Sequence, residues 1–106
     1  MGDRKYSELY TSLLAFLAER GRAAIEGVSE RGMPLASALE FIALLEANKV
    51  PIYGLEIWRP RARGYEIDLP SIWASRHGND HDYTGARSWL QLVKPRPDDL
   101  VAVQFG

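Results

Sequence analysis

The residues best suited to chemistry lie close together in one polar segment. Both histidines of the chain, His77 and His81, stand there with Asp80 and Asp82. Imidazole and carboxylate groups are metal ligands, and histidine is also a general acid or base near neutral pH. A spacing of four residues would place both rings on one helix face, but Gly78 opposes a helix, and the chain has no cysteine or further histidine to complete a tetrahedral site. We therefore expect a solvated loop without a metal ligand.

Three arginines, Arg59, Arg61 and Arg63, form a second candidate cluster between Trp58 and Tyr65. Guanidinium groups bind phosphates, and flanking aromatic rings stack on bases. The cluster is small, however, and the 13 basic residues are balanced by 14 acidic ones. A solvated turn is the simpler interpretation, and a nucleic-acid-binding adaptor remains an alternative.

The sequence contains no motif of a known catalytic machinery. It lacks a nucleophile elbow, a phosphate-binding P-loop and the glycine fingerprint of a dinucleotide site. We expect no enzyme, no catalytic residue and no cofactor. The alternative that stays open is a small enzyme or metal-binding domain centred on the segment 77–82.

Length and composition predict one domain over residues 1–106. The chain has 106 residues, of which 46% are hydrophobic, enough for a single core. The absence of cysteine removes any need for an oxidising compartment. The charged, amphipathic N-terminal segment does not resemble a secretory signal, and no uncharged run could span a bilayer. These observations predict a cytoplasmic protein without a membrane partner.

Apolar spacings of three and four residues predict two helices, over residues 7–20 and 34–48. Pro34 suits the first helical position of the second one. Residues 22–32 are interrupted by Gly27, Ser29 and Gly32 and are interpreted as a connector. The side chains expected to be buried by the two helices are Leu13, Leu17, Leu39, Ile42 and Leu45.

The second half of the chain predicts strands. Residues 52–58 and 65–69 form a hairpin with a basic tip, followed by a loop over 75–85, a short helix over 86–92 and a last strand over 100–105. This order is typical of an α+β fold, with two or three helices packed on one face of a small, mostly antiparallel sheet of about three strands. The residues expected to form its buried face are Leu55, Ile57, Ile67 and Leu69.

Three segments resemble a known family: Ala-Ile-Glu-Gly-Val-Ser-Glu (24–30), Ala-Leu-Glu-Phe-Ile-Ala-Leu-Leu (38–45) and Val-Pro-Ile-Tyr-Gly-Leu-Glu-Ile-Trp (50–58). They are similar to the immunity protein 40 family, bacterial proteins associated with polymorphic toxin systems. Asp68, Trp73 and residues 88–90 extend the similarity more weakly, to about residue 92. The family strand usually continues Gly-Gly-Asp, whereas this chain has Gly-Leu-Glu.

The resemblance implies a cytosolic inhibitor that binds one cognate toxin, and it implies no catalytic residue. Toxins that act on nucleic acids have basic clefts, so a carboxylate-rich loop with an aromatic anchor is a reasonable contact surface. The residues predicted to bind the toxin are Trp73, Asp80, His81, Asp82 and Tyr83, with Glu56 and Glu66 as extensions.

Overall fold

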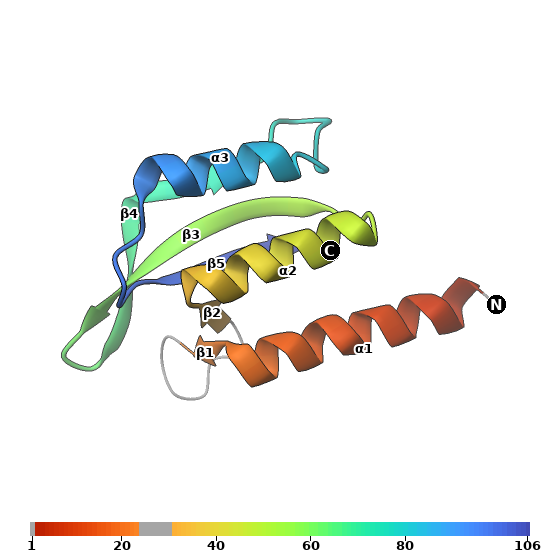
Figure 1. Ribbon diagram of the computed structural model, residues 1–106, viewed down its shortest axis with the longest axis horizontal. Coiled ribbons are helices and arrows are strands. Elements are labelled where there is room, and N and C mark those ends of the chain that lie inside the picture. The colour runs from red at the N-terminus through yellow and green to blue at the C-terminus, as the bar shows by residue number, and fades with distance from the viewer. Residues whose placement is uncertain (1, 24–30) are drawn as a thin grey trace.

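The elements of the fold alternate between helices and antiparallel strands. A computed structural model describes residues 2–23 and 31–106, with side chains from residue 8 onward in the first segment. The elements are α1 (Gly2–Arg20), β1 (Arg22–Ala23), β2 (Arg31–Met33), α2 (Leu35–Ala47), β3 (Ile52–Arg61), β4 (Gly64–Ala74), α3 (Tyr83–Val93) and β5 (Leu100–Phe105) (Figure 1). The predicted α+β class is confirmed.

The sheet has five strands in the order β1-β2-β5-β3-β4, and every neighbouring pair is antiparallel. The prediction of about three strands is too low, because β1 and β2 have only two and three residues. They fall in the segment interpreted as a connector, whose middle, residues 24–30, lies outside the described residues. Strands this short carry no recognisable alternation of polar and apolar residues.

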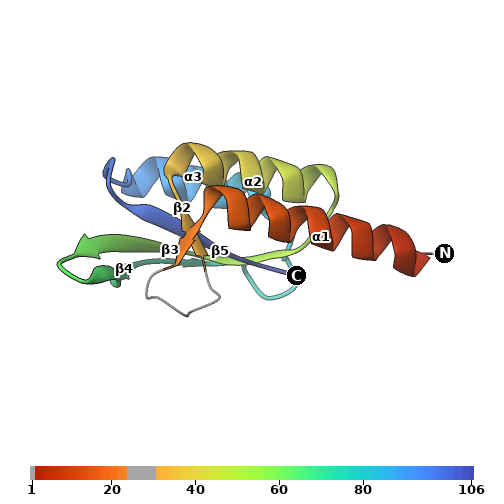
Figure 2. The ribbon, with the colours of Figure 1, turned by 90° about the horizontal axis from the view of Figure 1, so that it is seen from below.

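All three helices cover the same side of the sheet, which we call the helix face; the opposite side is the open face (Figure 2). Strand register assigns residues to the two faces, since successive side chains alternate. Leu55 lies opposite Trp73 and Val103, and all three belong to the core beneath the helices. Glu56 lies opposite Ile72 and Ala102 and therefore belongs to the open face.

The core lies between the helices and the helix face. Leu13, Ile42 and Leu45 are fully buried there, as predicted. Leu17 is only partly buried, and Leu39 is exposed, so the prediction for Leu39 is wrong. Leu39 lines a groove between α2 and α3, where no further element covers it within the described part of the chain.

The predicted apolar sheet face is correct for Leu55 and Ile57, which are buried, and wrong for Ile67 and Leu69, which are exposed. Ile67 lies opposite Trp58. Because Trp58 follows Ile57 directly along β3, its side chain points to the other side of the sheet, so Trp58 and Ile67 both belong to the open face. The register then shifts between β3 and β4, forming a bulge at residues 68–71 that contains Leu69. A bulge reorients side chains, so simple alternation fails at this point.

The element boundaries differ from the predicted ones for local reasons. Pro34 is the N-cap residue of α2, with φ −54° and ψ 153°, and precedes the helix instead of opening it. Helix α3 begins at Tyr83, within the predicted loop, because the side chain of Asp82 accepts a hydrogen bond from the backbone N–H of Gly85 and caps the helix. Strand β5 coincides with the prediction. Among the described residues, no helix combines the length and the apolar character that a membrane span requires.

Candidate partner-binding site

The loop between β4 and α3 is held against the junction of α2 and β3. The carbonyl of Asp80 accepts a hydrogen bond of 2.7 Å from the backbone N–H of Ile52. The ring of His81 lies between two partners, with Nδ1 2.8 Å from Oδ1 of Asp80 and Nε2 3.2 Å from the carbonyl of Lys49. The side chains of Asp80 and His81 remain about half exposed. The loop is thus anchored by its backbone and presents both side chains to solvent.

The next two predicted contact residues have structural roles. Asp82 caps α3, as described above. Tyr83 is buried, and its hydroxyl donates a hydrogen bond of 2.6 Å to the carbonyl of Val50. Burial raises the pKa of Tyr83, and the nearby charges of Glu46 and Asp80 act in the same direction. The ring of Tyr83 belongs to the core, and its contact with a partner stays a prediction.

The metal alternative finds no support in the geometry of the loop. In residues 2–23 and 31–106, no group of three histidine, aspartate or glutamate side chains is arranged to hold a metal ion. His77 and Asp82 are not joined to the Asp80–His81 pair by any contact that would form such a group.

The basic cluster is neutralised by acidic neighbours. Arg59 binds Asp99 through Nη1 at 3.0 Å and Asp68 through Nη2 at 3.1 Å. Arg61 pairs with Glu66 across the hairpin. Because β3 continues to Arg61, only Arg63 of the three arginines lies in the turn itself. Two of the three guanidinium groups therefore already have carboxylate partners, which weakens the case for a phosphate-binding tip.

The bulge of β4 orients Asp68 toward Arg59. The hydroxyl of Ser71 donates to Oδ2 of Asp68, and together with Arg59 it lowers the pKa of this carboxyl group, the hydrogen bond from Ser71 being the larger cause. In the sequence, only the family resemblance draws attention to Asp68. In the structure, Asp68 forms an ion pair with Arg59.

The seven predicted contact residues do not form one surface. Trp73 lies on the helix face, half buried against the core, whereas Glu56 lies on the open face. Glu66 lies near the hairpin tip, paired with Arg61. The structure brings only Asp80 and His81 together as neighbouring exposed side chains.

The open face carries a surface that the sequence interpretation missed. Ile67 and Ile72 on β4 are 38% and 46% exposed. Between Ile72 and the centre of the sheet lies Glu56, whose Oε1 accepts a hydrogen bond of 3.0 Å from Nε2 of Gln104. We call these four residues the open-face patch. The alternation of Gly54, Glu56 and Trp58 along β3 could have indicated a second sheet face, but the register of β4 could not be read from the sequence.

Two glycines shape the floor of the open face. At Gly54, a Cβ would lie 2.8 Å from Oε1 of Gln104, so the missing side chain gives Gln104 room to reach Glu56. At Gly32, a Cβ would lie 2.9 Å from Cε3 of Trp58, whose ring is buried on this side of the sheet against Leu100 and Ala102. Beyond Trp58 the face ends in a hollow of about 340 Å³ lined by Arg22, Pro34, Pro60, Tyr65, Pro97, Asp98 and Leu100.

The chain matches no family model, no curated protein and no solved structure in the comparisons made. The resemblance to the immunity protein 40 family therefore stays a prediction from the sequence.

Proposed function

We propose that the protein binds another protein and neutralises it, as an immunity protein neutralises its cognate toxin. One observation carries this proposal: the open-face patch places two exposed isoleucines beside a carboxylate fixed by hydrogen bonding. The isoleucines suit the apolar centre of a protein interface, and the carboxylate suits the polar rim of such an interface. The family resemblance supplies the class of partner.

A chain of this size can supply an interface of the usual area. A stable interface removes about 800 Å² from each partner, roughly a ninth of the 7049 Å² surface of this chain. The sheet offers a rigid platform, so little conformational entropy is lost when a partner docks on it. The hollow beside Tyr65 and Leu100 extends the same face and offers room for one anchoring side chain of the partner.

The charge of the patch favours a basic partner. Glu56 is held by Gln104 between apolar neighbours, where a partner's lysine or arginine gains a charge-assisted hydrogen bond. This agrees with a toxin that acts on nucleic acids. The exposed pair of Asp80 and His81 remains a second predicted contact surface for the same partner.

The test uses one substitution on the patch and one matched control. Ile72→Arg places a charge within the patch, and Leu92→Arg makes the same change at a side chain of α3 that is 79% exposed on the other side of the molecule. Each variant is co-expressed with the toxin encoded beside its gene, and growth, binding by calorimetry and the melting temperature are measured. We expect Ile72→Arg to lose protection and binding and Leu92→Arg to keep both, with both melting temperatures close to that of the parent protein.

Other outcomes point elsewhere. Full protection by Ile72→Arg, together with loss of protection in an Asp80→Lys variant that keeps the melting temperature of the parent, would move the interface to the loop. If the unaltered protein neither binds nor neutralises any product of its neighbouring genes, the immunity function is wrong.

A further inference from the structure

Residues 68–71 interrupt the outer strand of the sheet, and we call them the β4 bulge. On β3 a single residue, Ile57, lies between the last pair before the bulge and the first pair after it, whereas β4 has four residues there. Because β4 is the last strand of the sheet, the extra residues leave the ladder without meeting another strand. A further strand cannot pair continuously along such an edge, so a partner must recognise the β4 bulge by its side chains.

The β4 bulge is held in shape by polar contacts of its first and last residues. The hydroxyl of Ser71 donates a hydrogen bond to Oδ2 of Asp68, which joins the two ends of the bulge. The same oxygen accepts a hydrogen bond of 3.1 Å from Nη2 of Arg59, whose Nη1 binds the buried Asp99. Pro70 fixes one backbone dihedral angle between the two ends. The bulge is therefore ordered before any partner binds.

Leu69 lies inside the β4 bulge and is 75% exposed. Ile67 and Ile72 of the open-face patch flank the bulge and are also exposed. Single exposed apolar residues are common on protein surfaces, but three large aliphatic side chains on one short stretch of an edge strand indicate an interaction site. Because the backbone around Leu69 is already fixed, little conformational entropy is lost when its side chain is buried by a partner.

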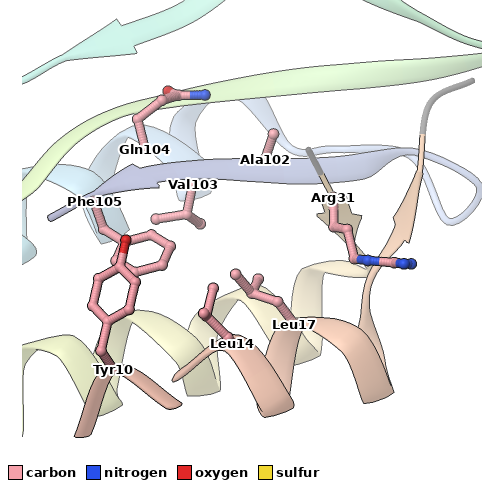
Figure 3. A pocket seen from close by; sticks show the side chains of 8 residues that line it. All are labelled: Tyr10, Leu14, Leu17, Arg31, Ala102, Val103, Gln104 and Phe105. Atoms are coloured by element: carbon pink, nitrogen blue, oxygen red, sulfur yellow. The ribbon is translucent and has the colours of Figure 1, made fainter. Parts of the chain in front are cut away.

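The charge beside the β4 bulge favours a basic partner over a second copy of the chain. Figure 3 shows Gln104 on β5 pointing away from α1, to the side opposite Val103. On that side Gln104 holds Glu56, which lies opposite Ile72 and forms no ion pair with any other described residue. Two copies packed on this surface would bring two Glu56 carboxylates together, and like charges repel.

We propose that Leu69 is the anchor of the partner interface and enters an apolar pocket on the neutralised protein, beside a basic side chain that meets Glu56. Ser71 and Asp68 are positioning residues, because their hydrogen bond fixes the bulge that carries Leu69. The inference rests on the proposed function and deepens it, since it states what the surface of the partner contains.

The first test uses the absence of cysteine from the chain. Leu69→Cys and Leu92→Cys each introduce a single thiol at a highly exposed position. Alkylation by a maleimide is followed through the mass of the intact chain, with and without the toxin encoded beside its gene. With the toxin at about ten times its dissociation constant, alkylation of Leu69→Cys should slow by about tenfold, and that of Leu92→Cys should not change.

The second test shortens the anchor. Leu69→Ala removes three carbon atoms that the partner buries, so binding of the toxin in calorimetry should weaken by about tenfold or more. Leu92→Ala makes the same change at an exposed leucine of α3 and should bind like the parent protein. Both melting temperatures should stay close to that of the parent, because neither side chain belongs to the core.

The third test concerns the positioning of the anchor. Ser71→Ala removes the hydrogen bond to Asp68 and should weaken binding by about threefold or more, whereas Ser71→Thr keeps the hydroxyl and should bind like the parent. In a chain that already carries Leu69→Ala, Ser71→Ala should have no further effect on binding, which a general loss of stability would not produce. Normal binding by Ser71→Ala would show that this hydrogen bond does not position Leu69.

Two results would overturn the inference and leave the proposed function in place. They are unchanged alkylation of Leu69→Cys in the complex, and full affinity of Leu69→Ala while Ile72→Arg loses binding. Self-association of the parent protein in ultracentrifugation that Leu69→Asp abolishes would assign the β4 bulge to a second copy of the chain and would also overturn the inference. A parent protein that binds no product of its neighbouring genes would overturn the proposed function and this inference together.

Discussion

Arg59 and Asp99 form an ion pair, with 3.0 Å between Nη1 and Oδ2, that joins β3 to the segment before β5. The side chain of Asp99 is almost completely buried, and its Oδ2 also accepts a hydrogen bond of 2.8 Å from the backbone N–H of Arg96. Its Oδ1 has no partner among the described residues. The charge of Asp99 therefore depends on Arg59 for much of its compensation.

Removing Arg59 should be costly. Arg59→Met leaves the carboxylate of Asp99 buried without its cation, and we expect a loss of roughly 3 kcal/mol in the free energy of unfolding, measured by urea denaturation. Arg61→Met is the control, because Arg61 and Glu66 form an exposed pair whose loss should cost less than about 1 kcal/mol. Equal losses in the two variants would contradict a special role for Arg59.

Tyr83 should contribute to stability through its hydroxyl group. Tyr83→Phe removes the buried hydrogen bond to the carbonyl of Val50 and keeps the ring, so the free energy of unfolding should fall by about 1 kcal/mol. The same change at Tyr53, which is exposed, should have little effect. A Tyr83→Phe variant as stable as the parent would show that the bond contributes nothing in water.

The lowered pKa of Asp68 predicts a dependence of stability on acid. Ser71 and Arg59 hold this pKa below its ordinary value of 3.8, so the carboxylate stabilises the folded state fully above that value, and the contribution is lost as the pH falls through the folded-state pKa. The melting temperature of Asp68→Asn should therefore fall less steeply than that of the parent between about pH 5 and pH 2. Ser71→Ala should lie between the two. Identical slopes in all three proteins would refute the assignment.

Two positions on α2 test the placement of the core. Ile42 is fully buried, and Ile42→Ala should cost roughly 2 to 5 kcal/mol. Leu39 is exposed in the groove between α2 and α3, so Leu39→Ala should cost less than half as much. Both values come from chemical denaturation, and a Leu39→Ala variant as unstable as Ile42→Ala would mean that Leu39 is buried in solution.

Much of the fold was predictable because its signals are local. The apolar stripe of α2 ends just before Asn48, a residue type that often ends a helix. The alternation of residue types in residues 100–105 predicts β5 directly. The short strands β1 and β2 have no such pattern, since two or three residues cannot display a period. The side of the sheet on which Ile67 lies depends on the register between β3 and β4, and a bulge shifts this register.

The candidate site was less predictable, for a related reason. The polar character of residues 80–83 suggests a contact surface. A polar loop residue can equally cap a helix, as Asp82 does. An aromatic residue at the end of a polar loop can belong to the core, as Tyr83 does. The residues of the open-face patch come from β3, β4 and β5. The patch can therefore be recognised only when the order and register of these strands are known. No local pattern in the sequence contains that information.

The position of β5 also bears on how the protein is made. Its neighbours β2 and β3 both leave the ribosome before it, yet β5 lies between them in the sheet. While the chain is being synthesised, β3 and β4 can form their hairpin, but Leu55 and Ile57 lack their cross-strand neighbours Val103 and Val101. Assembly of the sheet must therefore wait for the last strand, and until then the nascent chain exposes an apolar strand edge of the kind that chaperones protect.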